Sequence, residues 1–255
     1  MKLTNIVAFF ALIFSITSGN YSYAQEKVLK VGSTPTAIPF TFLDVKTNSI
    51  QGILVDIIRE IAEDSLFKIE IESIQFSSLI PSLTGNKIDI IAAAMFINPK
   101  RQEVIDFSRP IITYGEGLIV PKSDTLEYTG LADLKGKIIG VQKGTLFVES
   151  IEKSGLFSEV RIYDNIPSII ADVQAGRIHA GIIDKPIVVY NLQHGAYSNI
   201  RLVKSYISSM SGSIGIGVRK GDTALLGKIN ASIQKLQKNG AIDKIIAKWT
   251  GLEST

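Results

Sequence analysis

Several short stretches of the chain alternate between apolar and polar residues at every second position, which is the pattern of a β-strand with one buried face. The runs VLKVG (residues 28–32) and IEIESI (residues 69–74) show this alternation. Residues 88–95 instead form a nearly continuous apolar run bounded by turn residues, which favours a strand buried on both faces. Further strands are predicted over residues 111–120, 138–141, 160–163, 180–184 and 214–218.

Other stretches carry apolar residues three and four positions apart, which predicts helices with one buried face. The clearest begins near Leu54, where Val55, Ile58 and Ile61 recur at this spacing. Because strands and helices alternate along the chain, we expect an α/β fold with parallel sheets covered by helices. Further helices are predicted over residues 78–83, 131–135, 146–154, 166–175, 185–193, 223–238 and 242–249.

The alternation of strands and helices runs through the chain twice, once before about residue 117 and once after it. One strand and two helices at the end of the chain are more than the second half needs, so we expect them to complete the first half. Two crossings between the halves predict a hinged cleft, and clefts between lobes are common ligand sites.

Residues 76–109 join a short helix, a basic turn and the buried apolar run to an Asn-Pro turn that carries Arg101. A guanidinium group offers two parallel N–H donors, which suit a carboxylate. A second interpretation fits the same spacing, in which Arg101 lies on the surface and pairs with Glu103. The pattern of residues alone leaves both interpretations open.

Composition narrows the classes of function. The chain has 255 residues, of which 45% are hydrophobic and 20% charged, as expected of a globular protein. The net charge of +3 and the scattered Lys and Arg residues give no indication of nucleic-acid binding. Because the chain has no cysteine and only two histidines, disulfides and cysteine chemistry are excluded, and we expect no metal centre.

The first residues predict a targeting segment that is not part of the fold. Lys2 is followed by an apolar run over residues 6–16 and by the small-x-small sequence SYA at residues 22–24. A membrane span needs about 20 apolar residues, more than this run supplies. We therefore expect residues 1–24 to be a cleavable signal peptide and the mature protein to lie in the periplasm. A transmembrane anchor is the alternative.

Taken together, several stretches resemble the polar-amino-acid-binding proteins of ABC transporters, the family 3 extracellular solute-binding proteins. The longest is SLIPSLTGNKIDIIAAAMFINPKRQEVIDFSRP, over residues 78–110. It is accompanied, in the order of the family, by VGSTPTAIPFTF (31–42), LKGKIIGVQKGT (134–145) and AGRIHAGIIDKP (175–186). Each stretch alone is a weak signal, but the ordered set spans nearly all of the expected mature chain.

The resemblance implies the two-lobed α/β fold of type II periplasmic binding proteins, in which two hinge strands join the lobes. Lobe 1 would comprise residues 25–116 and 213–255, and lobe 2 residues 117–212. The implied function is to capture a free amino acid between the lobes and to deliver it to the permease of an ABC transporter in the inner membrane. We expect a monomer without a cofactor.

The resemblance also implies the residues of a binding site. Arg101 matches the family's Arg that grips the α-carboxylate of the ligand, and Asp184 matches the acidic residue for its α-ammonium group. Thr145, which follows Gly144 at a helix start, matches a residue that adds to carboxylate binding. Ala94 falls where the main chain contacts the ligand. Either residue could instead be a helix N-cap, and for Asp184 both roles could hold together.

The sequence departs from the family's pattern at the expected wall of the site. Ala37 and Thr34 stand where many members have an aromatic and an acidic residue, which argues against a specialist for lysine, arginine or histidine. Phe76 could supply the missing wall, and Phe96 replaces a common Ser or Thr, although either could be ordinary core. Glu116 could reach a ligand from the hinge or be a solvated charge. The identity of the amino acid is left open.

Two other functions share the implied fold. Cyclohexadienyl and arogenate dehydratases are similar, but their chemistry needs a carboxyl group as general acid, and no acidic residue beside Asp184 stands out. A ligand-sensing module of a membrane receptor is the third possibility, although the chain ends at Thr255, soon after the last predicted helix. We therefore expect a stand-alone binding protein without catalytic residues.

Overall fold

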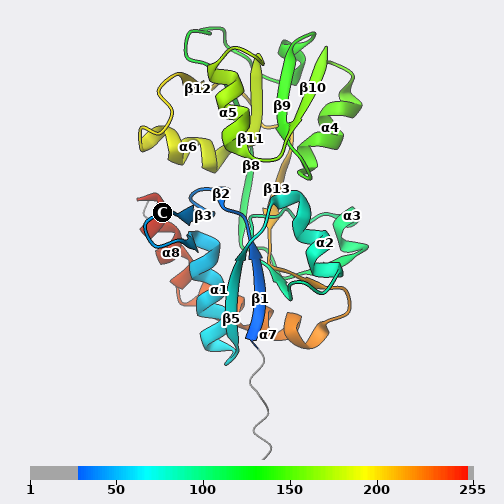
Figure 1. Ribbon diagram of the computed structural model, residues 1–255, viewed down its shortest axis with the longest axis vertical. Coiled ribbons are helices and arrows are strands. Elements are labelled where there is room, and N and C mark those ends of the chain that lie inside the picture. Colours follow the sequence, from blue (N-terminus) through cyan, green and yellow to red (C-terminus); the bar gives the residue numbers. More distant parts are fainter. Residues whose placement is uncertain (1–27, 252–255) are drawn as a thin grey trace, which may run out of the picture.

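The computed structural model describes residues 28–251, which fold into two halves, each built on its own β-sheet (Figure 1). The signal peptide predicted over residues 1–24 lies outside the described residues. None of the helices within the described part of the chain combines the length and the apolar character that crossing a membrane requires.

The first sheet has the strand order β5-β1-β6-β14-β7. β1 (Val28–Ser33) pairs in parallel with β5 (Lys68–Ser73) and with β6 (Ile90–Ile91). β14 (Gly217–Arg219) is antiparallel to both β6 and β7 (Ile105–Phe107). A strand from late in the sequence therefore completes the first sheet, as the surplus of elements at the end of the chain predicted.

Helices pack on the first sheet from two sides (Figure 1). α1 (Ile53–Asp64), α7 (Thr223–Lys238) and α8 (Ala241–Thr250) contact one another, and α1 also contacts β5. α2 (Leu79–Thr84) contacts β1, β6 and β14. The apolar face that the sequence predicted for α1, including Ile58, is buried, and burying such a side chain is worth about 1.5–3 kcal/mol.

Shorter elements connect these layers near the boundary of the two halves. β2 (Thr36–Ala37), β3 (Thr41–Asp44) and β4 (Ser49–Gln51) form a separate antiparallel sheet. A single 3₁₀ turn, η1 (Phe76–Ser78), leads into α2, and the one-turn helix α3 (Pro99–Gln102) precedes β7.

The second sheet has the strand order β10-β9-β11-β8-β12. β9 (Ile138–Gln142) lies parallel to β10 (Glu159–Tyr163) and to β11 (Ala180–Asp184). β8 (Ile112–Pro121) is antiparallel to β11 and to β12 (Ile200–Leu202). Both sheets are therefore mixed, and the prediction of parallel sheets is wrong for β8, β12 and β14. None of these strands directly follows or precedes its sheet neighbour along the chain, so no single connecting helix dictates a parallel pairing.

The helices of the second half agree with their predicted ranges to within one residue. They are α4 (Leu146–Ser154), α5 (Ile166–Gln174) and α6 (Lys185–Gln193). The short helix predicted over residues 131–135 is the 3₁₀ helix η2 (Leu131–Leu134).

Two neighbouring strands run between the halves (Figure 1). β13 (Ser211–Ile214) pairs antiparallel with the first residues of β8, so that Ser211 lies opposite Gly115 and Ile214 opposite Ile112. β8 continues beyond this ladder into the second sheet, where it pairs with β11 and β12. The two strands are the connections about which a hinge motion would occur. The exact boundaries of the lobes stay a prediction.

Two apolar runs predicted as single strands are interrupted. The apolar residues of 88–95 are buried, but only Ile90 and Ile91 join the ladder, and the chain then turns, with Ala94 at a left-handed φ of 50°. In the run of residues 214–218, β13 ends and β14 begins, with two residues between them. Both predictions are wrong in extent because a continuous apolar run reports burial and not strand pairing.

Candidate functional site

One small cavity between the two halves gathers all six residues that the sequence singled out. These are Phe76, Ala94, Phe96, Arg101, Thr145 and Asp184, and Leu146 and Phe147 complete the lining. The cavity has a volume of about 10 Å³, which is close to the space that one water molecule needs. The structure therefore brings the six residues together from both halves, while their binding roles stay predictions.

Arg101 is held in the cavity by a short local motif. The Asn98 side chain caps α3 by accepting a hydrogen bond from the Arg101 backbone N–H at 2.7 Å. The Arg101 side chain is only 8% exposed, so the alternative of a surface residue is wrong. Its Nη1 donates to the Phe96 carbonyl at 2.6 Å, and its Nη2 donates to the Gly144 carbonyl of the other half at 2.9 Å. A guanidinium has five N–H groups, so it can also serve a ligand.

The electrostatics of Arg101 follow from its burial. Burial lowers the pKa of Arg101 to about 10, and the negative charge of Asp184 opposes this shift. The guanidinium remains charged at neutral pH. Its central carbon lies 5.7 Å from the centroid of the Phe76 ring, which is the arrangement of a cation–π contact.

Asp184 ends β11 at the point where α6 begins. It occupies the N-cap position of α6, but its side chain makes no capping hydrogen bond, so the simple capping role is wrong. Burial raises the pKa of Asp184 to about 6, although a hydrogen bond from Tyr114 and the charge of Arg101 favour the ionised form. A carboxylate that is this poorly stabilised by the protein gains from a positively charged partner.

Thr145 and Ala94 offer polar atoms to the cavity. Thr145 precedes α4 but makes no side-chain capping bond, because its Oγ1 donates to the Gln142 carbonyl at 2.7 Å. The predicted alternative of a side-chain N-cap is therefore wrong. The Ala94 carbonyl accepts a hydrogen bond from the Tyr114 hydroxyl at 3.2 Å, so Ala94 acts through its main chain.

Tyr114 is a residue of this site that the sequence did not reveal. It lies on β8 and is 9% exposed. Its ring stacks on Phe40 with centroids 5.2 Å apart and is tilted against Phe96 at 4.8 Å. Its hydroxyl faces both the Asp184 carboxylate and the Ala94 carbonyl. Burial, first of all, raises the pKa of Tyr114 well above its ordinary value. In the sequence it was indistinguishable from a core aromatic of a strand.

Thr34 and Ala37, two positions at which the sequence departs from the family, lie outside the cavity lining. Thr34 and Thr41 are buried and bond to each other through their hydroxyl groups at 2.7 Å. Ala37 is buried as well. Phe96 packs edge-on against Phe147, with centroids 6.0 Å apart, and lines the cavity at the same time.

Glu116 is neither a solvated charge nor a lining residue of the cavity. Its side chain is fully buried and accepts hydrogen bonds from the Tyr206 hydroxyl at 2.9 Å and the Met210 backbone N–H at 3.0 Å. The backbone N–H and the hydroxyl of Ser209 also donate to it, at 2.6 Å and 2.9 Å. Glu116 therefore ties β8 to the segment before β13.

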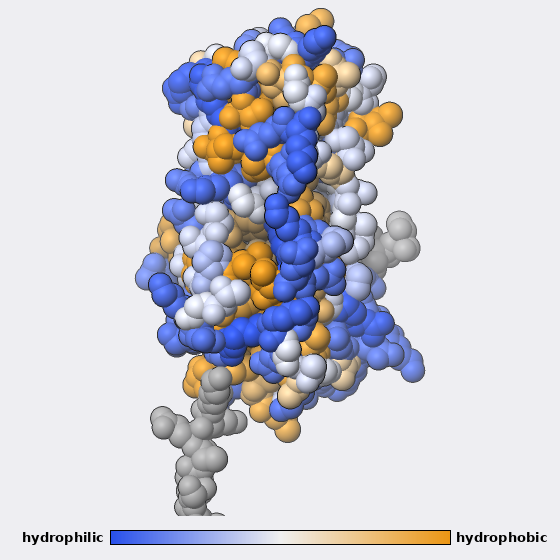
Figure 2. Space-filling model, turned by 90° about the vertical axis from the view of Figure 1, so that its right-hand side faces the viewer, coloured by the Kyte–Doolittle hydropathy of each residue, from blue (hydrophilic) through white to orange (hydrophobic). Residues whose placement is uncertain are grey.

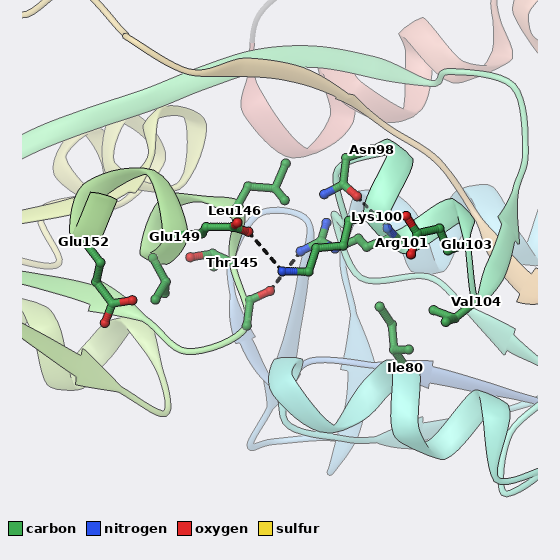
Figure 3. A pocket seen from close by; sticks show the side chains of 12 residues that line it. Ile80, Asn98, Lys100, Arg101, Glu103, Val104, Thr145, Leu146, Glu149 and Glu152 are labelled. Carbon is green, nitrogen blue, oxygen red and sulfur yellow. Dashed lines mark hydrogen bonds and ion pairs between the residues drawn. The ribbon is translucent and has the colours of Figure 1, made fainter. Parts of the chain in front are cut away.

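A larger groove of about 760 Å³ adjoins the cavity and shares Arg101, Thr145 and Leu146 with it (Figure 3). Lys100 reaches across this groove to Glu149 on α4, with Nζ 3.1 Å from the carboxylate oxygen. On the face of the molecule shown in Figure 2, hydrophilic residues form a band that runs from one half to the other. Within residues 28–251, no group of three or more His, Asp or Glu side chains is placed to hold a metal ion.

Comparison with known proteins finds solute-binding and amino-acid-binding proteins. The model of the bacterial extracellular solute-binding proteins, family 3, matches residues 29–252. The L-cystine-binding protein TcyJ of Escherichia coli (strain K12) is 27% identical over 231 residues, which cover 91% of this chain and 85% of that protein. The ABC transporter arginine-binding protein 1 of the same strain is 29% identical and covers 94% of this chain and 96% of its own.

Solved structures agree with the sequence comparison. An ancestral arginine-binding protein bound to glutamine has a TM-score of 0.80 at 32% identity, covering 88% of this chain and 98% of its own. A mutant of ArgBP from T. maritima has the same TM-score at 31% identity, covering 88% and 96%. The ancestral amino-acid-binding protein AncCDT-1, a precursor of cyclohexadienyl dehydratase, has a TM-score of 0.78 at 29% identity, covering 88% and 95%.

Proposed function

The chain belongs to the bacterial extracellular solute-binding proteins of family 3, and on that premise we propose that Arg101 and Asp184 hold a free amino acid in the cavity between its two halves. The relatives described above are amino-acid-binding proteins, and the arginine-binding protein 1 of Escherichia coli is named as part of an ABC transporter. The chain is accordingly a solute-binding protein of amino-acid transport with the type II periplasmic-binding-protein fold.

The observation that carries the proposal is the position of the two opposite charges. Arg101 comes from α3 of the first half and Asp184 from the end of β11 of the second half, and both line the same cavity. An amino-acid zwitterion brings one carboxylate and one ammonium group. A buried charge is costly unless it is paired, so a ligand that pairs both at once fits this site better than an ion of either sign.

The same geometry couples binding to closure. Arg101 donates to the Gly144 carbonyl, which lies just before Thr145 and α4 in the second half. A ligand carboxylate on Arg101 would therefore also lie within reach of the start of α4, where backbone N–H groups favour negative charge. Contacts made only when the halves meet stabilise the closed state over the open one.

We also propose the setting in which this binding operates. The lobes are residues 25–116 with 213–255 and residues 117–212, and they close as units about β8 and β13. The protein acts as a monomer in the periplasm after removal of residues 1–24, and it delivers its ligand to an inner-membrane permease. The periplasmic names of relatives such as the lysine/arginine/ornithine-binding protein of Escherichia coli support this setting.

The proposal is tested by thermal unfolding and calorimetric titration of the chain without residues 1–24 against the twenty common amino acids. A ligand that binds only the folded state raises the melting temperature by mass action. We expect one or a few amino acids to do so, and Arg101→Ala and Asp184→Asn to weaken their binding by at least about 100-fold, since each leaves a buried charge unpaired. Arg59→Ala, on the exposed face of α1, is the control that should bind normally.

The proposal fails if no amino acid shifts the unfolding transition, or if Arg101→Ala binds as the unaltered protein does.

We further propose that binding is not followed by turnover. A dehydratase acting on prephenate must place two carboxylates and supply a general acid. Among the lining residues, Arg101 is the one cation and Asp184 the one carboxyl group. A second substrate carboxylate would therefore stand unpaired near Asp184. Incubation with prephenate, followed by its conversion to an aromatic product, distinguishes the two functions, and we expect no conversion.

A further inference from the structure

The lining of the cavity contains charges for the two ends of an amino acid but none for its side chain. Of the eight lining residues, only Arg101 and Asp184 are charged. Thr145 adds a hydroxyl group, and its proton is already donated to the Gln142 carbonyl. The remaining five are Phe76, Ala94, Phe96, Leu146 and Phe147.

Aromatic rings reinforce this apolar wall from behind. Tyr114 packs between Phe40 and Phe96, with centroids 5.2 Å and 4.8 Å away, and its hydroxyl is directed to Asp184 and the Ala94 carbonyl. Phe147 meets Phe96 edge-on at 6.0 Å. Phenylalanine rings present only carbon and hydrogen, so a ligand side chain in the cavity meets mainly carbon atoms.

The loop after β1 adds no charge to the cavity either. Thr34 and Thr41 are buried, and each hydroxyl group is bonded to the other at 2.7 Å. A ligand with a charged side chain would have to bury that charge without a partner, which is unfavourable by a wide margin.

Resting on the proposed amino-acid binding, we infer that the ligand is an amino acid with an uncharged, apolar side chain, and that the Phe96 ring is the residue that selects it. The zwitterion uses Arg101 and Asp184, and the side chain packs among the phenylalanine rings. Free volume in the closed cavity is only about 10 Å³, so the rings and the two halves move apart by an amount that grows with the side chain, which favours compact ligands.

A ligand side chain could instead extend into the groove that adjoins the cavity. The groove shares Arg101, Thr145 and Leu146 with the cavity and carries Glu103, Glu149 and Glu152, so a long basic side chain that passed Leu146 would find negative charge there. Glu149 is already paired with Lys100 at 3.1 Å and with Lys153 at 2.7 Å. The charge of one of the three carboxylates is therefore already balanced, and we infer that the apolar cavity holds the side chain in preference to this route.

The first experiment compares affinities in the unaltered protein by calorimetric titration. Alanine, valine, leucine, methionine and phenylalanine form one group, and arginine, lysine, histidine and glutamate form the other. We expect the tightest ligand of the first group to bind at least about 100-fold more tightly than any member of the second. A charged amino acid that binds equally or more tightly overturns the inference but leaves amino-acid binding intact. Absence of binding in both groups, and by the remaining common amino acids, overturns the proposed function itself.

The second experiment assigns the selection to Phe96. Phe96→Ser removes the ring and adds a hydroxyl group, and Phe96→Leu removes the ring but keeps the site apolar. We expect Phe96→Ser to reduce the preference for leucine over glutamine by about 10-fold or more, and Phe96→Leu to retain most of it. Equal preference ratios in the two variants overturn the role of Phe96. Unfolding transitions recorded for both variants confirm that the folded proteins are compared.

Discussion

Asp184 and Glu116 are directly paired residues of the β11–β8 ladder, yet the protein treats the two carboxylates in opposite ways. Glu116 accepts four hydrogen bonds from Tyr206, Ser209 and Met210. Asp184 is stabilised less, by the Tyr114 hydroxyl, a backbone N–H and the charge of Arg101, and burial still raises its pKa to about 6. A carboxylate that the fold satisfies completely is a structural part, whereas one left short of donors is prepared for a ligand.

The largest effect is expected at Glu116. Glu116→Ala would remove the acceptor of the buried Tyr206 hydroxyl and of the Ser209 and Met210 donors, which lie closer to the surface. Each such group costs about 1–3 kcal/mol, so we expect the free energy of unfolding to fall by about 3–5 kcal/mol. Chemical denaturation at neutral pH measures it, with Glu60→Ala, on the exposed surface of α1, as the control. A loss below about 1 kcal/mol would mean that the segment finds other acceptors.

Asp184→Asn is expected to act in the opposite direction. The folded protein binds the Asp184 proton more tightly than the unfolded chain, whose carboxyl has the ordinary pKa of 3.8. The stability associated with that proton is complete below pH 3.8 and is lost as the pH rises through about 6. Without ligand, Asp184→Asn should therefore exceed the unaltered protein in stability by up to about 3 kcal/mol at pH 8.

The two proteins should converge in stability as the pH falls below 3.8, where Asp184 is protonated in both the folded and unfolded states. Denaturation curves from roughly pH 3 to pH 8 test this. A gap that persists unchanged at low pH would show that the substitution acts through packing and not through the charge.

An intermediate effect is expected at Tyr114. Its hydroxyl group stabilises the ionised Asp184, so Tyr114→Phe should raise the pKa of Asp184 further and reduce stability by about 1 kcal/mol at pH 8. The matched control is Tyr128→Phe, which removes a hydroxyl bonded to Asp124 at 2.9 Å, and neither of these residues lines the cavity. If the two variants change the pH dependence of the free energy of unfolding equally, the Tyr114 hydroxyl does not act specifically on the Asp184 carboxylate.

The smallest effect is expected at the surface of the groove. Glu149→Gln removes the carboxylate that Lys100 contacts from the other half. Both side chains are largely exposed, and exposed ion pairs contribute little. We expect ligand affinity to fall less than about threefold at low salt and the difference to vanish near 1 M salt, where charges are screened. A large loss that salt does not reduce would give Glu149 a direct role in binding.

Local signals in the sequence were sufficient for part of this site. Arg101 follows an Asn-Pro helix start, and Asp184 ends an apolar strand just before a helix, so both positions could be located from neighbouring residues. The start of α4 after Gly144 was located in the same way. The helices could be predicted for the same reason, because the spacing of buried residues can be read from each segment by itself.

Other features depend on residues that are far apart in the chain. The donors to Glu116 come from residues 206–210, and nothing near Glu116 in the sequence indicates that they will arrive. Tyr114 meets Asp184 and Ala94 only after both halves have folded. The position at which β6 ends, after Ile91, also depends on distant residues, because burial alone did not reveal where strand pairing stops. Sequence patterns indicate which residues of a segment are buried but not which distant residues they contact.

The whole second half is one uninterrupted stretch of chain whose entry strand, β8, and exit strand, β13, pair with each other. Paired strands lie about 4.8 Å apart, so the ends of this stretch form a narrow neck. Joining the chains of two related proteins at two points in this neck would exchange the whole second half between them as one cassette. The cassette would transplant Asp184 and Thr145 and leave Arg101 in its host. Recognition of the two ends of an amino acid is thus divided between parts that can be recombined independently.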